Sequence, residues 1–276
     1  MRAELVEKLR KGEAQHKFDH GHALVLTGGA GRTGAARLAA RAALRVGAGL
    51  VSLGAPGAGL MECAAQSTAV MCRRCEDADG LRRLLDDERI NALCLGPGSG
   101  VARAGELLPV AMGSGRPVVL DADALTALAR DDGLFGALHG RTVLTPHGGE
   151  FGRLFPDLMA SLSDGRSKGD VTREAAERAR CVVLFKGAET VIAEPGGGVV
   201  VNTSTGEVAA PWLATAGSGD VLAGLIAGLL ARGFDPMEAA EAGTWLHAEC
   251  ARAFGPGLIA EDLPEQVPGV FRELGL

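Results

Sequence analysis

Short aliphatic runs recur along this 276-residue chain, and each is followed by small or polar residues and then by a longer segment with helical spacing. The runs are continuously apolar instead of alternating, which is typical of strands buried on both faces between helix layers. Strands that alternate with helices in this way predict an α/β fold with a mainly parallel sheet. The predicted strands cover 23–27, 50–53, 92–95, 117–120 and 142–144, and the clearest helices cover 33–46 and the segment up to about Met112.

The pattern changes after a predicted helix at 171–179. Three strand-like runs follow, at 182–185, 190–193 and 199–202, and only short connections that contain glycine separate them. Connections this short join antiparallel strands, so we expect hairpins at one edge of the sheet.

Three further helices are expected, at 221–230, at 236–253 and after Leu263. Glycine and proline are frequent in 46–61, which favours a strand and loop there, and 161–169 has the composition of a surface excursion. No internal repeat or linker interrupts the chain, so we expect one domain over 1–276.

The helix predicted at 221–230 is preceded by Thr-Ala-Gly-Ser-Gly-Asp, which ends at Asp220. Small residues let the backbone approach a ligand, and the first amides of a helix lack partners within it. With the positive end of the helix dipole, those amides form a site for an anion such as phosphate. A carboxylate there repels phosphate, so we interpret Asp220 as a base that takes a proton from an attacking hydroxyl. The alternative is an aspartate that only stabilises the dipole.

Composition narrows the function classes. The net charge of −6 disfavours a general binder of polyanions, and the absence of tyrosine, with 4% aromatic residues, argues against stacking on nucleic-acid bases. No apolar run reaches the length of a membrane span, and the charged N-terminus lacks the apolar centre of a signal peptide. We therefore expect a cytoplasmic protein that binds neither nucleic acid nor membrane. Cys72 and Cys75 form a CxxC pair without the further ligands of a zinc site.

Ligands bind beyond the carboxyl ends of the strands in such sheets. Each predicted strand ends in residues suited to binding, and we expect at most one of Asp121 and Asp123 to face the cleft, since Asp123 is equally suited to cap a helix. The strand ends are Gly28-Gly29-Ala30-Gly31, Gly96-Pro97-Gly98, Asp121-Ala122-Asp123, Thr145-Pro146-His147-Gly148-Gly149-Glu150 and Lys186-Gly187-Ala188-Glu189.

Together with Thr33-Gly34-Ala35 and Ala216-Gly217-Ser218-Gly219-Asp220, these motifs in this order resemble the ADP/ATP-dependent NAD(P)H-hydrate dehydratases, members of the ribokinase-like superfamily. The resemblance extends from about His16 to Leu274. Its most specific parts are the runs at 121–125 and 145–150. It implies a ribokinase-like three-layer α/β/α sandwich with a mainly parallel central sheet and an antiparallel hairpin edge.

The resemblance also implies repair of a damaged cofactor. Hydrated NADH and NADPH (NADHX and NADPHX) carry a hydroxyl on the reduced nicotinamide ring. A nucleotide phosphorylates the hydroxyl of the (6S) form, and the phosphate then leaves to restore NADH or NADPH. The implied co-substrate is ADP or ATP, of which ADP is the common donor in bacterial relatives, and the implied metal is Mg²⁺. Phosphoryl transfer depends mostly on positioning and charge stabilisation, which suits an anion site built from backbone.

Carried over by position, the resemblance gives the motifs separate roles. Asp220 is expected to deprotonate the hydroxyl, and Glu150 to organise magnesium through water. The expected anion hole is Ala216, Gly217, Ser218 and Gly219. The expected nucleotide-binding residues are Lys186, Gly187, Ala188, Glu189, Thr190 and Gly219. The expected hydrate-binding residues are Ala35, Gly98, His147 and Asp220.

Several positions keep two interpretations. The 186–190 stretch also fits an ordinary polar hairpin, and Trp212 either covers the nucleotide or packs against the protein. His147 either binds the nicotinamide amide or caps the helix of Glu150. Gly148 replaces a proline that is common in relatives, which loosens a loop but removes no reactive group.

Two rival functions share these motifs. A small-molecule kinase of the superfamily, such as a hydroxyethylthiazole kinase, has the same anion hole and base but releases a stable phosphate ester; the run at 145–150 favours the dehydratase. A nucleotide-binding regulator without catalysis has no use for the charge of Asp220. The resemblance also implies a homo-oligomer, tetrameric in many relatives. It implies a separate NAD(P)H-hydrate epimerase as well, because we expect no N-terminal epimerase domain in this chain.

Overall fold

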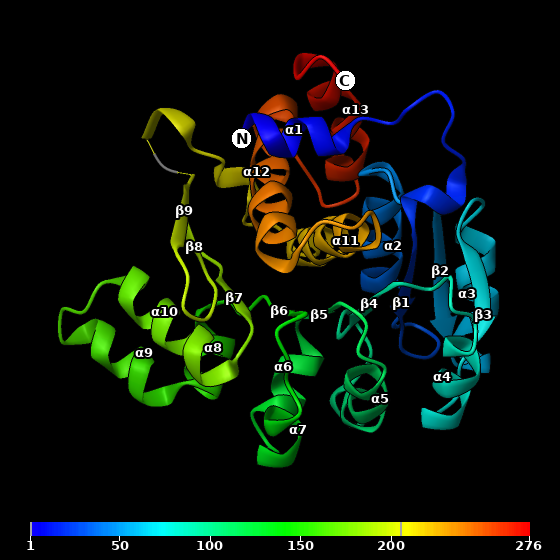
Figure 1. The fold of residues 1–276 in the computed structure, drawn as a ribbon, viewed down its shortest axis with the longest axis horizontal. Helices are drawn as coiled ribbons and strands as arrows, with labels where there is room; N and C mark the ends of the chain where they lie inside the picture. The colour runs from blue at the N-terminus through cyan, green and yellow to red at the C-terminus, as the bar shows by residue number, and fades with distance from the viewer. Residues whose placement is uncertain (1, 205) are drawn as a thin grey trace.

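The computed structural model describes residues 2–204 and 206–276. Nine strands form one sheet in the order β3-β2-β1-β4-β5-β6-β7-β8-β9. Helices cover both faces of this sheet, so the chain forms three layers (Figure 1). The strands are β1 (His22–Leu26), β2 (Leu50–Ala55), β3 (Met71–Arg74), β4 (Ala92–Leu95), β5 (Val118–Leu120), β6 (Thr142–Leu144), β7 (Val182–Phe185), β8 (Glu189–Ala193) and β9 (Val199–Thr203).

Strands β1 to β7 are parallel, and only β8 and β9 are antiparallel to their neighbours. Every residue of β1, β4, β5, β6 and β7 is buried, as continuous apolar runs predict. The expected parallel sheet with an antiparallel hairpin edge is therefore confirmed. Because β4 to β7 are neighbours with one direction, the loops that follow them lie along the same edge of the sheet.

The helices form two layers. In Figure 1, α1, α2, α11, α12 and α13 lie above the sheet and α4 to α10 lie below it, while α3 packs against β2 and β3. The helices are α1 (Ala3–Leu9), α2 (Gly34–Arg45), α3 (Gly57–Gln66), α4 (Ala78–Leu85), α5 (Val101–Gly113), α6 (Asp123–Leu128), α7 (Asp132–Gly136), α8 (Gly148–Leu154), α9 (Pro156–Ser163), α10 (Lys168–Ala179), α11 (Ser218–Ala231), α12 (Pro236–Phe254) and α13 (Asp262–Glu273), with 3₁₀ turns η1 (Lys17–His20), η2 (Gly206–Val208) and η3 (Pro211–Leu213).

Helices α2 and α11 pack backbone against backbone. A Cβ atom on Gly224 would collide with the carbonyl of Ala39, and one on Gly228 would lie 2.7 Å from the carbonyl oxygen of Ala43. Eleven consecutive residues of α11, from Val221 to Ala231, are buried. Helix α11, which carries Asp220 in its first turn, is therefore fixed against α2 by close contact of small residues.

The expectation of a loop in 46–61 is wrong at its end. Helix α3 begins at Gly57, and its Gly59 packs so closely on the first glycine loop that a Cβ would lie 2.9 Å from the carbonyl oxygen of Gly28. The glycine serves close packing of a helix, a use that composition does not distinguish from a loop. The predicted excursion at 161–169 is also shorter than expected, because α9 ends at Ser163 and α10 begins at Lys168.

In the part of the chain that the structure describes, no helix combines the length and apolar character needed to cross a membrane. All six cysteines are free thiols. Cys72 is half-buried and Cys75 is buried, and burial raises the pKa of both thiols. The CxxC pair therefore has the environment of packing residues rather than of reactive thiolates.

Candidate active site

The start of α11 is a turn that requires glycine. Gly217 has a φ of 89°, and a Cβ there would lie 2.8 Å from Cδ1 of Leu38 on α2. The amides of Gly219 and Asp220 donate to no protein acceptor among the described residues. The turn thus presents free donors at the positive end of a helix, the arrangement expected of an anion hole at 216–219, whose occupant remains a prediction.

Asp220 lies half-buried in the first turn of α11. Burial and then the negative charge of Asp121 raise the pKa of Asp220 from its ordinary 3.8 to about 7. Glu150 and Asp123 add to the rise, while the positive charge of Lys186 opposes it. A carboxylate with a pKa near neutrality suits general base catalysis at physiological pH.

Lys186 follows β7 and is enclosed by acidic groups. Its Nζ donates to Oδ1 of Asp121 at 2.7 Å and lies 3.9 Å from Oε2 of Glu150. The Oγ1 of Thr145 donates to the same Asp121 oxygen at 2.8 Å. Burial opposes the charge of the lysine, but the carboxylates outweigh it and raise the pKa of Lys186. The side chain therefore remains an ammonium close to Asp220, where it can balance the charge of a phosphoryl group.

The two aspartates after β5 have different hydrogen-bond partners. Asp121 is buried beside Lys186, whereas Oδ2 of Asp123 accepts the amide of Gly100 at 2.8 Å. Asp123 therefore satisfies the start of α5 and does not cap its own helix, for which Ala122 is the N-cap.

His147 caps α8, one of its two expected roles. Its Nδ1 accepts the amides of Gly149 at 2.9 Å and Glu150 at 3.4 Å, while Oε2 of Glu150 accepts the amide of His147 at 2.9 Å. This reciprocal pair is a capping box. Because Nδ1 is an acceptor, a neutral His147 carries its proton on Nε2, in a side chain that is 56% exposed. Capping therefore leaves a donor for a ligand.

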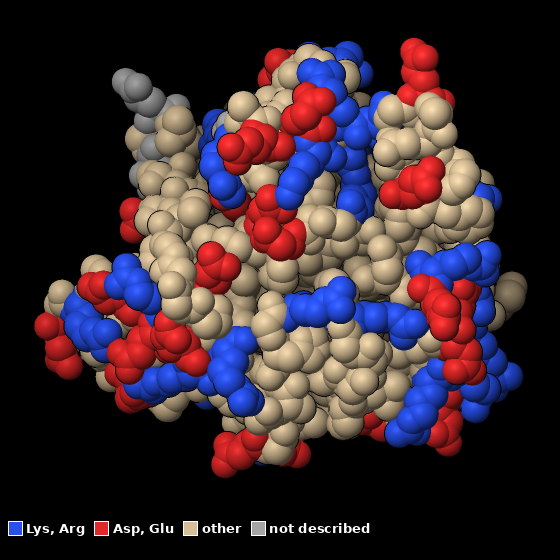
Figure 2. All heavy atoms as spheres, viewed as in Figure 1, with Lys and Arg blue, Asp and Glu red and all other residues tan. Residues whose placement is uncertain are grey.

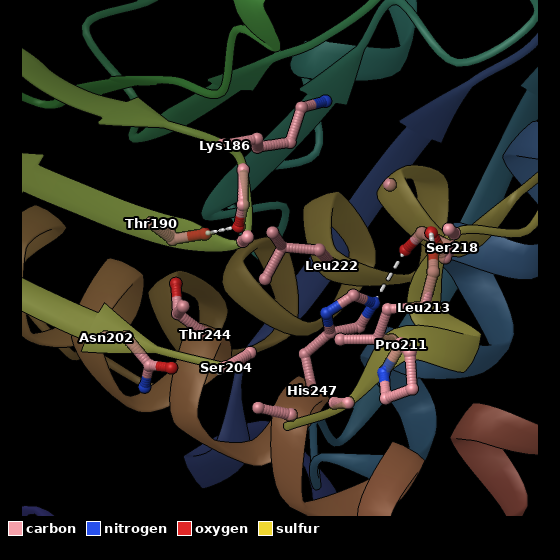
Figure 3. Close-up of a pocket in the computed structure, with 16 residues that line it drawn as sticks. Lys186, Thr190, Asn202, Ser204, Pro211, Leu213, Ser218, Leu222, Thr244 and His247 are labelled. Carbon is pink, nitrogen blue, oxygen red and sulfur yellow. Dashed lines mark hydrogen bonds between the residues drawn. The ribbon is translucent and has the colours of Figure 1, made fainter. Parts of the chain in front are cut away.

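A cavity of about 360 Å³ lies between the β7–β8 turn, the start of α11, η3 and α12 (Figure 3). Five of the six residues expected to bind nucleotide line it. Glu189 does not, and its side chain is exposed. The five are Lys186, Gly187, Ala188, Thr190 and Gly219. The cavity also includes Pro211 and Leu213, whereas Trp212 between them is outside its lining and 45% exposed.

Two cavity residues on α12, Thr244 and His247, were not predicted from the sequence. The Nε2 of His247 lies 2.8 Å from the carbonyl oxygen of Ser218 (Figure 3). Burial lowers the pKa of His247 to about 4, so the ring is neutral and donates its Nε2 proton to that carbonyl. Both residues are buried polar groups three apart on a helix, a signal that could have pointed to the cavity.

Ala35 and Gly98, two of the four residues expected to contact the hydrate, lie next to the glycine loop after β1. Gly98 has a φ of 63°, and a Cβ there would lie 2.5 Å from the carbonyl oxygen of Arg32 and 3.4 Å from Cβ of Ala35. The backbone conformation and the close contact with Arg32 therefore require glycine at position 98, whether or not a ligand binds. Gly34 is different, because a Cβ there meets nothing closer than 4.0 Å.

No group of three or more His, Cys, Asp or Glu side chains converges as a metal cage among the described residues. The acidic groups around Asp220 enclose the ammonium of Lys186 instead. Magnesium at phosphoryl-transfer sites is usually held by one or two carboxylates together with phosphates and water. The donor set present here fits that mode and not a cage made by protein alone.

Comparisons with known proteins agree with this geometry. A family model described as NAD(P)H-hydrate dehydratase matches residues 23–265. The bifunctional NAD(P)H-hydrate repair enzyme Nnr of Moorella thermoacetica is 39% identical over 96% of this chain and 52% of its own length. A ribokinase-like superfamily protein of Enterococcus faecalis has a TM-score of 0.81 at 21% identity, over 99% of this chain and 95% of that one. The ADP/ATP-dependent NAD(P)H-hydrate dehydratase of Bacillus subtilis, co-crystallised with ATP and Mg²⁺, has a TM-score of 0.80 at 28% identity, over 96% and 94%.

The fold is thus that of the ribokinase-like α/β proteins. Within that class, the chain belongs to the NAD(P)H-hydrate dehydratase family. It spans about half the length of the curated relatives it matches, 52% of the Moorella protein and 46% of one from Gloeobacter violaceus. This membership favours the dehydratase over the hydroxyethylthiazole-type kinase.

Proposed function

We propose that this protein dehydrates the (6S) hydrates of NADH and NADPH, with ADP or ATP as the phosphoryl donor, and so acts as a carbon–oxygen lyase in metabolite repair. The observation that carries the proposal is the position of Asp220. Its carboxyl has a pKa of about 7 and lies in the first turn of α11, next to Lys186 and the cavity. The amides of Gly219 and Asp220 in the same turn have no protein acceptor among the described residues. A base, an anion site and a fixed cation together are what transfer of phosphate to an alcohol requires.

The proposed reaction has two stages. Asp220 takes the proton of the ring hydroxyl as its oxygen bonds to the terminal phosphorus of the nucleotide, whose bond to the bridging oxygen breaks to release AMP from ADP or ADP from ATP. The carbon–oxygen bond then breaks with the phosphate as leaving group. A proton is lost from the neighbouring ring carbon, and the ring double bond is restored. The free amides at the start of α11 and Lys186 would stabilise charge on the phosphoryl group in the first stage.

The nucleotide would occupy the cavity between the β7–β8 turn and α12, with Lys186 at its phosphate end. Glu150 is the residue we propose to hold Mg²⁺ through water, because it is buried beside Lys186 and its Oε1 lies 3.5 Å from Nε2 of His147. Bound magnesium supplies charge neutralisation on the phosphates. The ring hydrate would lie toward Ala35, Gly98 and His147.

The test is to mix the purified protein with hydrated NADH, Mg²⁺ and either ADP or ATP. We expect recovery of the near-ultraviolet absorbance of the reduced nicotinamide ring, and the comparison of the two nucleotides identifies the donor. Asp220→Asn should bind nucleotide but turn over about 10²–10⁴ times more slowly, as loss of a general base predicts. Phosphorylation of a thiazole alcohol without recovery of ring absorbance would instead identify a kinase.

We also propose that the 1–276 chain works as one domain in the cytoplasm, where reduced nicotinamide cofactors and adenine nucleotides circulate. The single sheet that all nine strands share supports one domain. An NAD(P)H-hydrate epimerase would act in the same pathway and supply the (6S) form; the Moorella relative is named as a bifunctional repair enzyme. A homo-oligomer, and a tetramer in particular, remains a prediction that light scattering on the purified protein can test.

A further inference from the structure

Lys168, the first residue of α10, packs against the β7–β8 turn but belongs to none of the motifs described above. Its Nζ donates to the carbonyl oxygen of Lys186 at 3.2 Å and to that of Glu189. The ammonium also lies 4.2 Å from the centre of the Phe185 ring. In the described chain no carboxylate lies within ion-pair distance of it, so neutral carbonyls and an aromatic face are its partners. Burial lowers the pKa of Lys168 to about 8, against the attraction of Glu189.

The inner carbonyls of the same turn are also bound. The carbonyl of Gly187 accepts the hydroxyl of Thr190 at 3.1 Å, and the carbonyl of Ala188 accepts the amide of Ser204 at 2.9 Å. All four carbonyls from 186 to 189 therefore have a donor within the protein, two of them from one ammonium. In contrast, the amides of Gly187 and Ala188 donate to no acceptor among the described residues, and both residues line the cavity.

Glycine at position 187 leaves space beside this contact. A Cβ there would lie 2.9 Å from Nζ of Lys168, although the φ of Gly187 is not in the left-handed region. The absent side chain thus leaves room for the ammonium to reach the carbonyls on either side. Gly187 and the ammonium of Lys168 are therefore direct neighbours.

We propose that Lys168 is a positioning residue for nucleotide binding. By holding the carbonyl of Lys186, it fixes the peptide plane that carries the free amide of Gly187. Its second bond, to the carbonyl of Glu189, holds the end of the 186–189 turn, so that the free amides of Gly187 and Ala188 remain available to acceptor atoms of ADP or ATP. An ammonium has three N–H donors, so one lysine can hold both carbonyls at once. Hydrogen bonds from a charged donor are also about twice as strong as neutral ones. This inference rests on the proposed use of the cavity by nucleotide.

The experiment compares Lys168→Met, which keeps the aliphatic stem but removes the donor, with Lys168→Arg, which restores a charged donor. Lys17→Met is the matched control, because Lys17 also lies over a phenylalanine, 5.3 Å from the centre of the Phe18 ring, on the distant η1 turn. Steady-state rates give KM for the nucleotide and kcat, and calorimetric titration with ADP and with ATP in Mg²⁺ measures binding directly. Thermal melts record folding.

We expect Lys168→Met to raise the nucleotide KM and Kd about tenfold, a factor that corresponds to about 1.4 kcal/mol, with kcat and the KM for the hydrate changed less than threefold. Lys168→Arg should recover most of the loss, and Lys17→Met should match the unmodified protein. An unchanged nucleotide KM in Lys168→Met, or a fall in kcat alone, overturns the role of Lys168 while leaving the proposed function intact. An unmodified protein that binds neither nucleotide overturns the proposed function instead. If Lys168→Met does not fold, Lys168→Gln, which has a shorter and uncharged donor, should show the same rise in KM, and its absence overturns the proposal equally.

Discussion

Replacing Asp220 by asparagine should make the protein more stable at pH 8 although it removes the proposed base. The carboxyl is held where its charge is unfavourable, because it is partly buried and Asp121 lies among its neighbours. Ionisation of Asp220 therefore has a cost in folding free energy. Asparagine has nearly the same shape and carries no charge.

The magnitude follows from the pKa. The folded-state pKa of Asp220 is about 7, against an ordinary 3.8. A raised pKa means that folding favours the protonated acid, so the stability contribution is undiminished below about pH 4, falls as pH rises towards 7, and stays reduced above it. The pKa rises by about three, and each pH unit of that rise corresponds to about 1.36 kcal/mol. The loss of folding free energy at pH 8 is therefore at most about 4 kcal/mol. Asparagine does not recover all of it, and we expect a gain of about 1–3 kcal/mol, or about 2 °C or more in Tm.

The assay is thermal unfolding of both proteins from pH 4 to pH 8 in the absence of nucleotide. The Tm of Asp220→Asn should exceed that of the unmodified protein at pH 8, and the difference should shrink towards pH 4, where the aspartic acid is protonated. An equal or lower Tm for the variant at pH 8 would refute the argument that the carboxyl is strained by its surroundings. Far-ultraviolet circular dichroism at 20 °C serves as the check that the variant keeps the fold.

Three further outcomes are expected. The kcat/KM should fall about tenfold for each pH unit below about 7, because only ionised Asp220 accepts a proton, and a pH–rate profile that is flat to pH 5 contradicts this. Gly98→Ala should lower Tm, because the residue has a φ of 63° and a Cβ there would lie 2.5 Å from a carbonyl oxygen. Gly34→Ala should keep Tm, because a Cβ there would meet no atom closer than 4.0 Å, and should raise only the KM for the hydrate. In thermal melts, Gly217→Ala should lower the free energy of unfolding by more than about 1 kcal/mol beyond the loss in Gly233→Ala. Both glycines have a positive φ, but only a Cβ at position 217 would meet other atoms within 4 Å, so equal losses would show that backbone strain alone matters.

Most of the fold was predictable because most strands are buried on both faces and therefore appear as continuous apolar runs. Strand β3 was missed for the opposite reason. It forms an edge of the sheet, its sequence is Met-Cys-Arg-Arg, and none of its residues is buried. Helix α3 was missed because Gly57 and Gly59 have the composition of a loop, while the close contact of Gly59 with the first glycine loop appears only in three dimensions.

The candidate site could be proposed from sequence where its residues are consecutive. Asp220 was singled out because glycine, a carboxylate and a following apolar helix are adjacent, and the stretch at 186–190 because a lysine and a glycine directly follow a strand-like run. The hydrogen bond of His247 to the carbonyl of Ser218 could not be predicted from the sequence, because it depends on how α12 packs against a residue 29 positions earlier. Likewise, the raised pKa of Asp220 depends on burial and then on the charge of Asp121, which follows a strand distant in sequence.

The glycine contact between α2 and α11 limits where the protein can move. Ala35 lies on one of these helices and Asp220 on the other, and Gly224 and Gly228 let the two backbones touch. Such a joint resists sliding, since any shift would drive main-chain atoms together. We therefore expect the proposed base and the proposed ring pocket to move together as one rigid unit. We expect movement that admits or releases a ligand to occur instead where Thr190 of β8 and Asn202 of β9 line the cavity.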